Sequence, residues 1–424
     1  MKVLVVGSGG REHALCWKLA QSPRLEKLYC APGNPGIDGV AETVAIAGDD
    51  VESLVAFAAE RGIDLTVVGP ELPLVLGLAD ALRERDLGVF GPCAAAARLE
   101  GSKVFAKEFM NRHGISTANF VVVESAAMAR EALPRFGLPV VLKADGLAAG
   151  KGVLIPGSER EFEEALRIFF DERRFGAGGE RVVMEAHLTG EEVSMIALCD
   201  GHQVMPLATS KDYKRIGEGD TGPNTGGMGA HSPAGVLGPG QESEIVAAAM
   251  EPVIAGMAAD GHLFSGVLYA GMILTEAGPQ VLEYNVRLGD PEAQPLLMRL
   301  DGDLLPVLAA AAGGGFGGET LSFKKGAAAC VVLASSGYPG TPVKGEPISG
   351  LEAAEAMEEV EVFHAGTSGE AGRIVSAGGR VLNVCATGPD LRAALERAYR
   401  ATAEISWASK TFRRDIGLRV AGRA

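Results

Sequence analysis

The stretch VLVVGSGGREHA occupies residues 3–14 and joins an apolar run to a glycine-rich turn. The pattern predicts a strand over residues 3–6 and a helix over residues 11–21. A turn of this kind presents free N–H groups and the positive end of a helix dipole, which together hold an anion. Arg11 adds a guanidinium that suits phosphate. We therefore expect a phosphate-binding turn, although a purely structural tight turn stays open on these residues alone.

The turn departs from the dinucleotide-binding fingerprint G-x-G-x-x-G. Gly7 and Gly9 fit its first two positions, but Glu12 occupies the third. We expect Glu12 to prevent the close packing of helix on strand that the third glycine normally allows. A nicotinamide-dependent dehydrogenase is therefore a distant alternative.

The bulk composition is typical of a globular protein. The chain has 424 residues, enough for two to four domains, and a net charge of −15, which argues against nucleic-acid binding. No apolar run approaches the roughly 18 residues of a membrane span. Its six cysteines are scattered without a Cys-x-x-Cys pair, as is typical of reduced thiols in the cytosol. We expect a soluble cytoplasmic α/β protein that binds neither nucleic acid nor membrane.

The first hundred residues alternate between strand and helix patterns, including a single helix over residues 74–85. Such alternation predicts a parallel sheet with helices on both faces. Ligands of these sheets bind beyond the carboxyl ends of the strands. Three segments stand at those ends and can line one crevice: residues 7–11, 32–35 and 69–71.

The rest of the chain divides into two further units. We place an N-terminal domain at residues 1–102, a central domain at 103–327 and a β-rich domain at 328–424. Residues 210–230 lack hydrophobic periodicity and are expected to form a long loop. The glycine-rich residues 309–319 are expected to form a flexible linker.

Glu283 and Asn285 are the strongest candidates for a metal site. They lie two apart in an expected strand and so share one face. Mg²⁺ prefers oxygen ligands and often takes one or two carboxylates together with substrate phosphates. A polar strand end remains the alternative for so short a motif.

Two glycine-rich segments carry charged side chains. Lys143 and Lys151 surround a glycine loop that is not a P-loop, because Gly152 stands at its Ser/Thr position. The lysines can clamp phosphates, or the segment can be a surface hairpin with solvated lysines. Residues 210–229 mix charged side chains with glycines, which favours a binding loop over a disordered tract.

Arg287 follows the expected metal strand directly, in the sequence Arg-Leu-Gly-Asp-Pro-Glu of residues 287–292. An arginine beside a phosphate can stabilise the charge that develops in phosphoryl transfer. The alternative is a salt-bridged turn, since Asp290 before a proline also starts helices.

Taken together, these motifs resemble the glycinamide ribonucleotide synthetase (phosphoribosylamine–glycine ligase) family of the ATP-grasp superfamily. The resemblance covers essentially the whole chain, through VLVVGSGGREHA, APGNPG, TVVGPELPLV, LEGSK, KADGLAAGKGV, DTGPNTGGMGA, EYNVRLGDPE and VFHAGT in this order. It implies a Rossmann-like (pre-ATP-grasp) N-terminal domain and an ATP-grasp core. It also implies a small α+β lid at about residues 123–190 and a β-rich C-terminal domain.

The resemblance implies that the protein joins glycine to 5-phosphoribosylamine through glycyl phosphate, at the expense of ATP, in purine biosynthesis. ATP is then a substrate, and Mg²⁺ or Mn²⁺ is the implied cofactor. The other implied partners are the small-molecule substrates and, transiently, the enzyme that supplies phosphoribosylamine. We expect a monomer. A sister ATP-grasp ligase and a catalytically inactive nucleotide sensor are the rival interpretations.

Carried over by position, the family implies four sets of site residues. The catalytic set is Arg287, Asp212, Lys214 and Asp290. The ATP-binding set is Lys103, Lys143, Gly150, Lys151, Gly152, Glu185, Leu188 and Glu192, with adenine read by the main chain at 185–188. The substrate-binding set is Gly9, Gly10, Arg11, Asn34, Glu71, Asp220, Asn224, Thr225 and Gly289. The metal ligands are Glu283 and Asn285. We further expect the 5-phosphate of phosphoribosylamine on the Gly9–Arg11 turn.

Three positions depart from the pattern expected of the family. The adenine hinge reads Met-Glu-Ala-His-Leu over residues 184–188, without a second acid or an aromatic residue. His231 stands where a tyrosine is more usual, and the strand at residues 269–272 lacks the metal-binding acid of many ATP-grasp enzymes.

Overall fold

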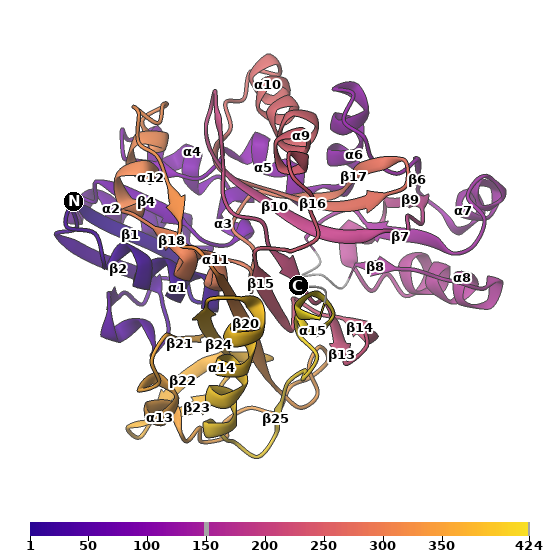
Figure 1. Ribbon diagram of the computed structural model, residues 1–424. Coiled ribbons are helices and arrows are strands. Elements are labelled where there is room, and N and C mark those ends of the chain that lie inside the picture. Colours follow the sequence, from indigo (N-terminus) through magenta and orange to yellow (C-terminus); the bar gives the residue numbers. More distant parts are fainter. Residues whose placement is uncertain (148–151, 423–424) are drawn as a thin grey trace.

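The N-terminal region is a parallel sheet with helices on both faces, as the alternating sequence pattern predicts. In the computed structural model, which describes residues 1–147 and 152–422, the strand order is β3-β2-β1-β4-β5 (Figure 1). The strands are β1 (Lys2–Gly7), β2 (Lys27–Pro32), β3 (Glu42–Thr43), β4 (Leu65–Val68) and β5 (Val89–Phe90). The helices are α1 (Gly10–Leu19), α2 (Val51–Arg61), α3 (Glu71–Val75), α4 (Leu78–Arg83) and α5 (Ala94–Gly101). The apolar run of β1 is buried on both faces, which is typical of parallel sheets.

The prediction of one helix over residues 74–85 is wrong. The segment is divided between α3 and α4, and Gly77 between them has a φ of 86°. A left-handed residue cannot continue a right-handed helix, so the chain changes direction there. α3 begins at Glu71, just beyond the carboxyl end of β4.

The central region contains two antiparallel sheets. The larger has the order β11-β10-β16-β17, and the smaller, the lid, has the order β6-β9-β7-β8 and projects to the right in Figure 1. The strands are β6 (Phe120–Val123), β7 (Val140–Ala144), β8 (Val153–Leu154), β9 (Val182–Ala186), β10 (Glu191–Asp200), β11 (Val204–Pro206), β16 (Ser265–Thr275) and β17 (Gly278–Asn285). The helices are α6 (Lys103–Arg112), α7 (Ala126–Ala132), α8 (Glu159–Leu166), α9 (Gln241–Ile245) and α10 (Glu251–Ala259).

Residues 210–230 are not the long loop that the sequence predicts. They form β12 (Lys211–Asp212) and the hairpin β13 (Arg215–Gly217) to β14 (Thr221–Asn224), and they lead into β15 (Gly229–Ser232). β12 pairs with β15, and β15 pairs with β20 of the C-terminal sheet. The strands are too short and too rich in glycine to show a period of two in the sequence.

The C-terminal region is built on an antiparallel sheet with the order β12-β15-β20-β24-β21, and β25 also pairs with β20. Two of its strands, β12 and β15, come from the central region of the chain. The strands are β20 (Ala327–Ser335), β21 (Val360–His364), β22 (Thr367–Glu370), β23 (Arg373–Ser376), β24 (Arg380–Gly388) and β25 (Lys410–Thr411). The helices are α13 (Leu351–Glu355), α14 (Leu391–Glu404) and α15 (Leu418–Ala421).

The segment between the central and C-terminal regions is ordered rather than a flexible linker. It contains α11 (Ala293–Arg299), β18 (Leu300–Asp301), α12 (Leu304–Ala312) and β19 (Ser322–Phe323). α12 covers the start of the expected linker, and Phe316 within its glycine run is buried, with its N–H donated to the Asp200 carboxylate at 3.1 Å. Helix α11 contacts α1, β20 and β24, so it lies where the three regions meet. No helix in residues 1–147 or 152–422 is long and apolar enough to cross a membrane.

Candidate active site

The Glu12 side chain hydrogen-bonds to the glycine turn and does not prevent the turn from forming. Its carboxylate accepts a hydrogen bond from the Gly9 N–H at 2.6 Å, so it occupies the N-terminal end of α1. A Cβ at Gly7 or at Gly69 would lie 2.5 or 2.2 Å from Glu12 atoms. The expectation that Glu12 prevents close packing is therefore wrong, because these two glycines at the ends of β1 and β4 make room for it.

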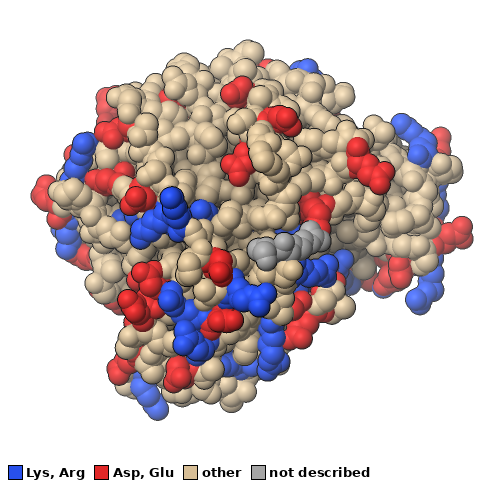
Figure 2. Space-filling view, in the orientation of Figure 1, with Lys and Arg blue, Asp and Glu red and all other residues tan. Residues whose placement is uncertain are grey.

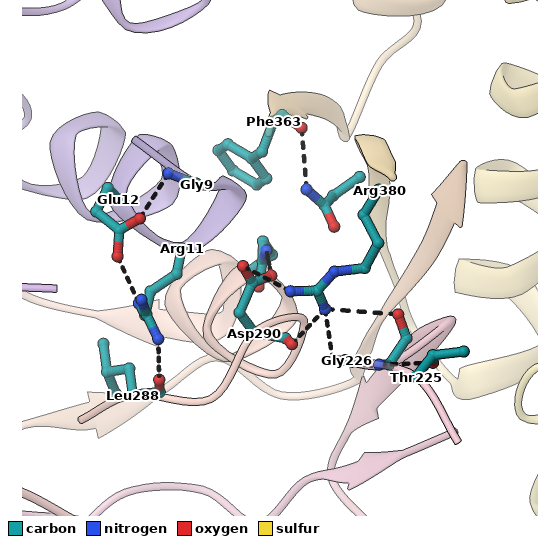
Figure 3. Close-up of polar contacts among 12 residues, drawn as sticks. Gly9, Arg11, Glu12, Thr225, Gly226, Leu288, Asp290, Phe363 and Arg380 are labelled. Carbon is teal, nitrogen blue, oxygen red and sulfur yellow. Dashed lines mark hydrogen bonds and ion pairs between the residues drawn. The ribbon is translucent and has the colours of Figure 1, made fainter. Parts of the chain in front are cut away.

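Arg11 is held between the turn and a distant loop. Its Nε lies 2.5 Å from the Glu12 carboxylate, and its Nη1 donates to the Leu288 carbonyl at 3.1 Å (Figure 3). A Cβ at Gly10 would lie 2.0 Å from the side chain of Asn383 on β24. The turn is thus packed against both other regions, and any anion there shares the Gly9 N–H with Glu12.

Arg287 lies at the centre of a buried charge network. Its Nη2 donates to Glu100 at 2.8 Å and to the Asn285 Oδ1 at 3.2 Å, and its Nε donates to Glu71 at 3.3 Å. Burial alone would lower the pKa of Arg287, but the Glu100 and Glu71 carboxylates outweigh burial and raise it. Its charge is therefore fixed in place and ready to face an anion.

Asp290 lies beside the glycine turn. Its carboxylate accepts a hydrogen bond from Gln294 at 2.8 Å, and a Cβ at Gly9 would lie 3.4 Å from its Oδ2. Burial favours a raised pKa for Asp290, but the Arg380 and Arg11 guanidiniums prevail and lower it. Asp290 is thus an anion at neutral pH, although it is half-buried.

Arg380 is a site residue that the sequence analysis misses. It projects from β24, with its Nη2 3.3 Å from the Asp290 carboxylate and its Nη1 2.6 Å from the Asp290 carbonyl (Figure 3). Its Nη1 also binds the Gly226 carbonyl. No local motif marks this arginine, because its partners lie about 90 and 150 residues away in the chain.

Two lysines share one buried carboxylate on the lid side of the site. Glu185 lies 2.5 Å from Lys143 and 2.5 Å from Lys107, and Lys143 also donates to the Leu282 carbonyl at 3.0 Å. Burial lowers the pKa of Lys107 to about 8, against the attraction of Glu185. Lys107 is also missed from sequence, although its position one helical turn after Lys103 is a usable signal.

Glu283 and Asn285 lie two apart on β17, so the alternation of a strand places them on one face. Lys103 lies 3.1 Å from Glu283 and is the main reason why the pKa of this carboxyl is lowered despite burial. One ionised carboxylate and one amide oxygen suit Mg²⁺ or Mn²⁺ that completes its shell with substrate phosphates. Within the described residues no group of three or more His, Cys, Asp and Glu could hold a metal by itself.

Asp212 and Lys214 both interact electrostatically with Glu283. Lys214 Nζ is 3.2 Å from the Glu192 carboxylate and 4.0 Å from that of Asp212. Burial raises the pKa of Asp212 to about 7; Lys214 opposes the rise, and the Glu292 and Glu192 carboxylates add to it. Asp212 can therefore exchange a proton near neutral pH.

At the departure in residues 269–272, an acid from another segment contacts the strand. The Tyr269 hydroxyl donates to the Glu292 carboxylate at 2.8 Å, so an acid reaches this strand from α11's start. His231 is buried between the Pro233 carbonyl, 2.9 Å from Nδ1, and the Tyr213 hydroxyl, 3.3 Å from Nε2. Burial lowers the pKa of His231 to about 4.

The structure also places five of the other expected site residues. Thr225 donates to the Lys214 carbonyl at 2.7 Å, and the Gly152 carbonyl accepts from the Ala144 N–H at 2.9 Å. A Cβ at Gly289 would lie 2.5 Å from Glu292. Leu188 follows β9 and is half-buried, and Asn224 ends β14. Gly150 and Lys151 lie outside the described residues.

Two expected substrate ligands are already engaged elsewhere. Asn34 donates to the Ser8 carbonyl at 2.8 Å and to the His364 carbonyl at 2.9 Å. Asp220, at the tip of the β13–β14 hairpin, lies 2.9 Å from Arg413 and 3.1 Å from Arg419. No contact of the described residues joins Asp220 to Arg287 or Asp290, so its expected role at the substrate stays a prediction.

Three family descriptions match nearly the whole chain. They are the phosphoribosylglycinamide synthetase N domain over residues 1–100, its ATP-grasp (A) domain over 101–293 and its C domain over 328–419. The chain belongs to the phosphoribosylglycinamide synthetase family. Its site is therefore shared among all three family domains, with Arg11 from the N domain, Arg287 from the ATP-grasp domain and Arg380 from the C domain.

Relatives of this family align from end to end. A phosphoribosylamine–glycine ligase of Rhizobium meliloti is 51% identical over 100% of this chain and 99% of its own. One from Vibrio cholerae is 47% identical over the same shares. The crystal structure of the Thermotoga maritima phosphoribosylamine–glycine ligase has a TM-score of 0.85 at 36% identity, covering 98% of this chain and 100% of that one. A biotin carboxylase domain of Hydrogenobacter thermophilus, 18% identical with a TM-score of 0.74 over 97% and 91% of the two chains, shares the fold alone.

Proposed function

We propose that the chain ligates glycine to 5-phosphoribosylamine, with ATP converted to ADP and phosphate, and so forms glycinamide ribonucleotide in purine biosynthesis. The observation that carries this proposal is the 51% identity, over the whole length of both chains, to a phosphoribosylamine–glycine ligase. The site agrees with it, because buried lysines, arginines and carboxylates converge from three domains. We further infer a cytoplasmic monomer that receives its unstable amine from the enzyme that makes it.

The first step activates glycine. A glycine carboxylate oxygen attacks the γ-phosphorus of ATP, the new O–P bond forms as the bond to the ADP oxygen breaks, and glycyl phosphate results. Lys103 and Lys143 hold the phosphates of ATP in this proposal. Its support is that a carboxylate pairs with each ammonium group and orients it. The main chain at residues 185–188 reads adenine, and Glu192 binds the ribose hydroxyls. Arg287 stabilises the charge that spreads over the transferring group.

The second step forms the C–N bond. The amine of phosphoribosylamine attacks the glycyl carbonyl carbon, and the C–O bond breaks as phosphate leaves. We place the amine substrate beside Gly9, Arg11 and Glu71, opposite Asp290. Asp212 is suited to accept the proton that the attacking amine loses, because its pKa of about 7 matches the working pH. Lys214 and Asp290 orient the reacting groups.

Glu283 and Asn285 are the residues that would hold Mg²⁺ or Mn²⁺. When bound there, the ion supplies positive charge to the ATP phosphates. The ionised state of Glu283 and the shared face of the two side chains support this assignment.

An omission experiment tests the proposal. ADP release is measured with ATP, Mg²⁺, glycine and freshly generated phosphoribosylamine, leaving out one component in each reaction. We expect release only when glycine and the amine are both present, with glycinamide ribonucleotide formed in equal amount. Release without glycine would instead favour a sister ATP-grasp ligase. No release in any mixture would refute a ligase and leave a nucleotide sensor.

A further inference from the structure

A cleft of about 340 Å³ lies away from the active site, between the C-terminal sheet and the segment that leads into it. One wall consists of Arg299 at the end of α11 and of Lys324 and Lys325 after β19. The other wall consists of the end of β24 around Thr387 and of Arg397 on α14. The first wall falls between the family's ATP-grasp and C domains, at residues that neither description covers.

The cleft gathers positive charge that its own carboxylates do not neutralise. Four cations line it, and within the described part of the chain none of them forms an ion pair with a carboxylate. Figure 2 shows Lys and Arg side chains gathered over β18 and over α14, on a molecule whose net charge is −15. Unpaired cations around one concavity repel one another, and an anion between them removes that repulsion.

Arg299 is a buried cation of the first wall, and its position is fixed by a hydrogen bond. The residue is 9% exposed, and its Nη1 donates to Ser232 at 2.8 Å, which fixes the guanidinium. Its buried Nε finds no acceptor in the described structure. Lys324 is tied to the same residue, because its N–H donates to the Arg299 carbonyl at 2.8 Å.

Charged side chains around the cleft both add to and reduce its positive charge. Lys18 of α1 lies close enough to Lys324 for the two ammonium groups to repel each other, while Asp301 and Asp303 attract Lys18. Glu242 attracts Arg299 from outside the cleft. Glu359 is the one carboxylate among the lining residues, and it accepts a hydrogen bond from the Thr387 hydroxyl. One carboxylate against four cations leaves the cleft positive.

We propose that this cleft binds a small phosphorylated metabolite, separately from the catalytic substrates. Two guanidiniums and two ammonium groups supply the charge-assisted donors that phosphate oxygens accept. The volume lies at the lower end of ligand pockets, which suits a phosphate with a compact group attached rather than a polymer. The cleft lies at the junction between the two domains, where a bound ligand would join their walls.

Inorganic pyrophosphate at low ionic strength is the probe. Its binding is followed by calorimetry for the full chain, for the double variant Lys324→Gln/Lys325→Gln and for a control, Lys344→Gln/Arg373→Gln, which removes two exposed cations outside the cleft. The catalytic site contributes equally in all three. We expect the full chain and the control to bind one more equivalent than the cleft variant, or to bind it at least about tenfold more tightly.

A crystal soaked with tungstate then locates the ion, and we expect it between Arg299 and Arg397. Pyrophosphate binding is the readout, so this test does not depend on the proposed function. The cleft variant should also keep the ligase activity of the full chain, because the cleft lies away from the active site. Equal pyrophosphate binding by all three proteins would overturn the proposal. Tungstate in the cleft without a difference in solution would mark an adventitious ion only and would also overturn it.

Discussion

Arg11 is the residue that most directly tests where phosphoribosylamine binds. Two of its nitrogens are occupied by Glu12 and the Leu288 carbonyl, so the remaining Nη2 is the group that can reach a phosphate. In the variant Arg11→Gln we expect the KM for phosphoribosylamine to rise about 10- to 100-fold, the cost of one lost charged hydrogen bond. The KM for ATP should stay within about twofold.

Steady-state kinetics with each substrate varied in turn makes this measurement. Thermal unfolding of the variant serves as the control, because loss of the Glu12 partner also lowers stability. Equal rises in both KM values would show that Arg11 acts on the fold of the site rather than on the amine.

His231 gives the protein a specific sensitivity to acid. Its folded-state pKa of about 4 lies below the ordinary value of 6.5, so between these values the unfolded chain binds a proton that the folded chain does not. Stability is therefore lost as the pH falls through this window, by on the order of 3 kcal/mol for this one residue. The variant His231→Gln removes the proton site and should flatten the fall in Tm between pH 6.5 and pH 4.

The matched control is His262→Gln, because His262 is exposed. Its pH profile of Tm should follow that of the unaltered chain. His13 and His364 are buried as well, with pKa values lowered to about 3 and about 4, so some acid sensitivity remains in both variants. Identical slopes for the two variants would contradict the assignment to His231.

For single residues, the sequence predicts site residues that belong to a local motif. It misses residues that reach the site only through the fold. Glu283 and Asn285 are foreseeable because a period of two places them on one face. Arg380 is not, because nothing local to β24 marks it and its partner Asp290 belongs to another domain. Glu12 is foreseen as an obstacle because the glycines that receive it, Gly7 and Gly69, lie 62 positions apart in the chain.

Among the elements, the β13–β14 hairpin depends on the C-terminal segment. Arg413 is 1% exposed, donates to the Arg215 carbonyl at 3.0 Å and to Asp220 at 2.9 Å, and pairs with Asp415. The hairpin leads from Lys214, so Arg413 fixes the segment that carries a proposed catalytic residue. A hairpin of two short strands is marginal without such support.

We therefore expect the variant Arg413→Met to loosen the hairpin. Amide hydrogen exchange over residues 215–224 should accelerate at least about tenfold, and kcat should fall more than the KM for ATP rises. Arg413→Lys should restore part of the protection, since it keeps the charge beside Asp220.

Arg419→Ala is the control for this variant, because Arg419 contacts the same Asp220 but is exposed. It should leave the exchange of the hairpin almost unchanged. Unaltered exchange in Arg413→Met would show that the hairpin is held by its own strand pairing. The sequence could not reveal this element, because glycines and polar residues hide strands of two to four residues.

Over the whole molecule, the regions differ in how far each can fold alone. The lid has its own core, formed by buried residues between Val123 and Met184, and its four strands pair only with one another among the described residues. The C-terminal sheet is different, because β12 and β15 come from the middle of the chain; β12 pairs with β15, and β15 pairs with β20. Sequence analysis predicts the order of these regions along the chain. It does not predict that strands of the central region join the C-terminal sheet, because the pairing strands lie about a hundred residues apart.

Two deletions test whether the lid and the C-terminal domain differ in how much the rest of the chain depends on them. Replacing residues 120–186 by a short glycine linker removes the lid at adjacent ends, since Phe120 pairs with Glu185. We expect the remainder to unfold cooperatively with a Tm near that of the full chain, although it binds ATP poorly without Lys143. A fragment of residues 1–327 keeps the active-site lysines but strips β20 from β15 and from α11.

We expect the 1–327 fragment to aggregate. It would expose the edge of β15 that pairs with β20, although β12 still covers the other edge, and it would uncover the face of α11 that contacts β20 and β24. Size-exclusion chromatography and near-ultraviolet circular dichroism measure the outcome. Adding the fragment of residues 328–424 during refolding should restore a soluble complex, since the lost contacts are non-covalent. A monomeric, cooperatively folding 1–327 fragment would show instead that the C-terminal domain is only docked, and that Arg380 reaches Asp290 across a separable interface.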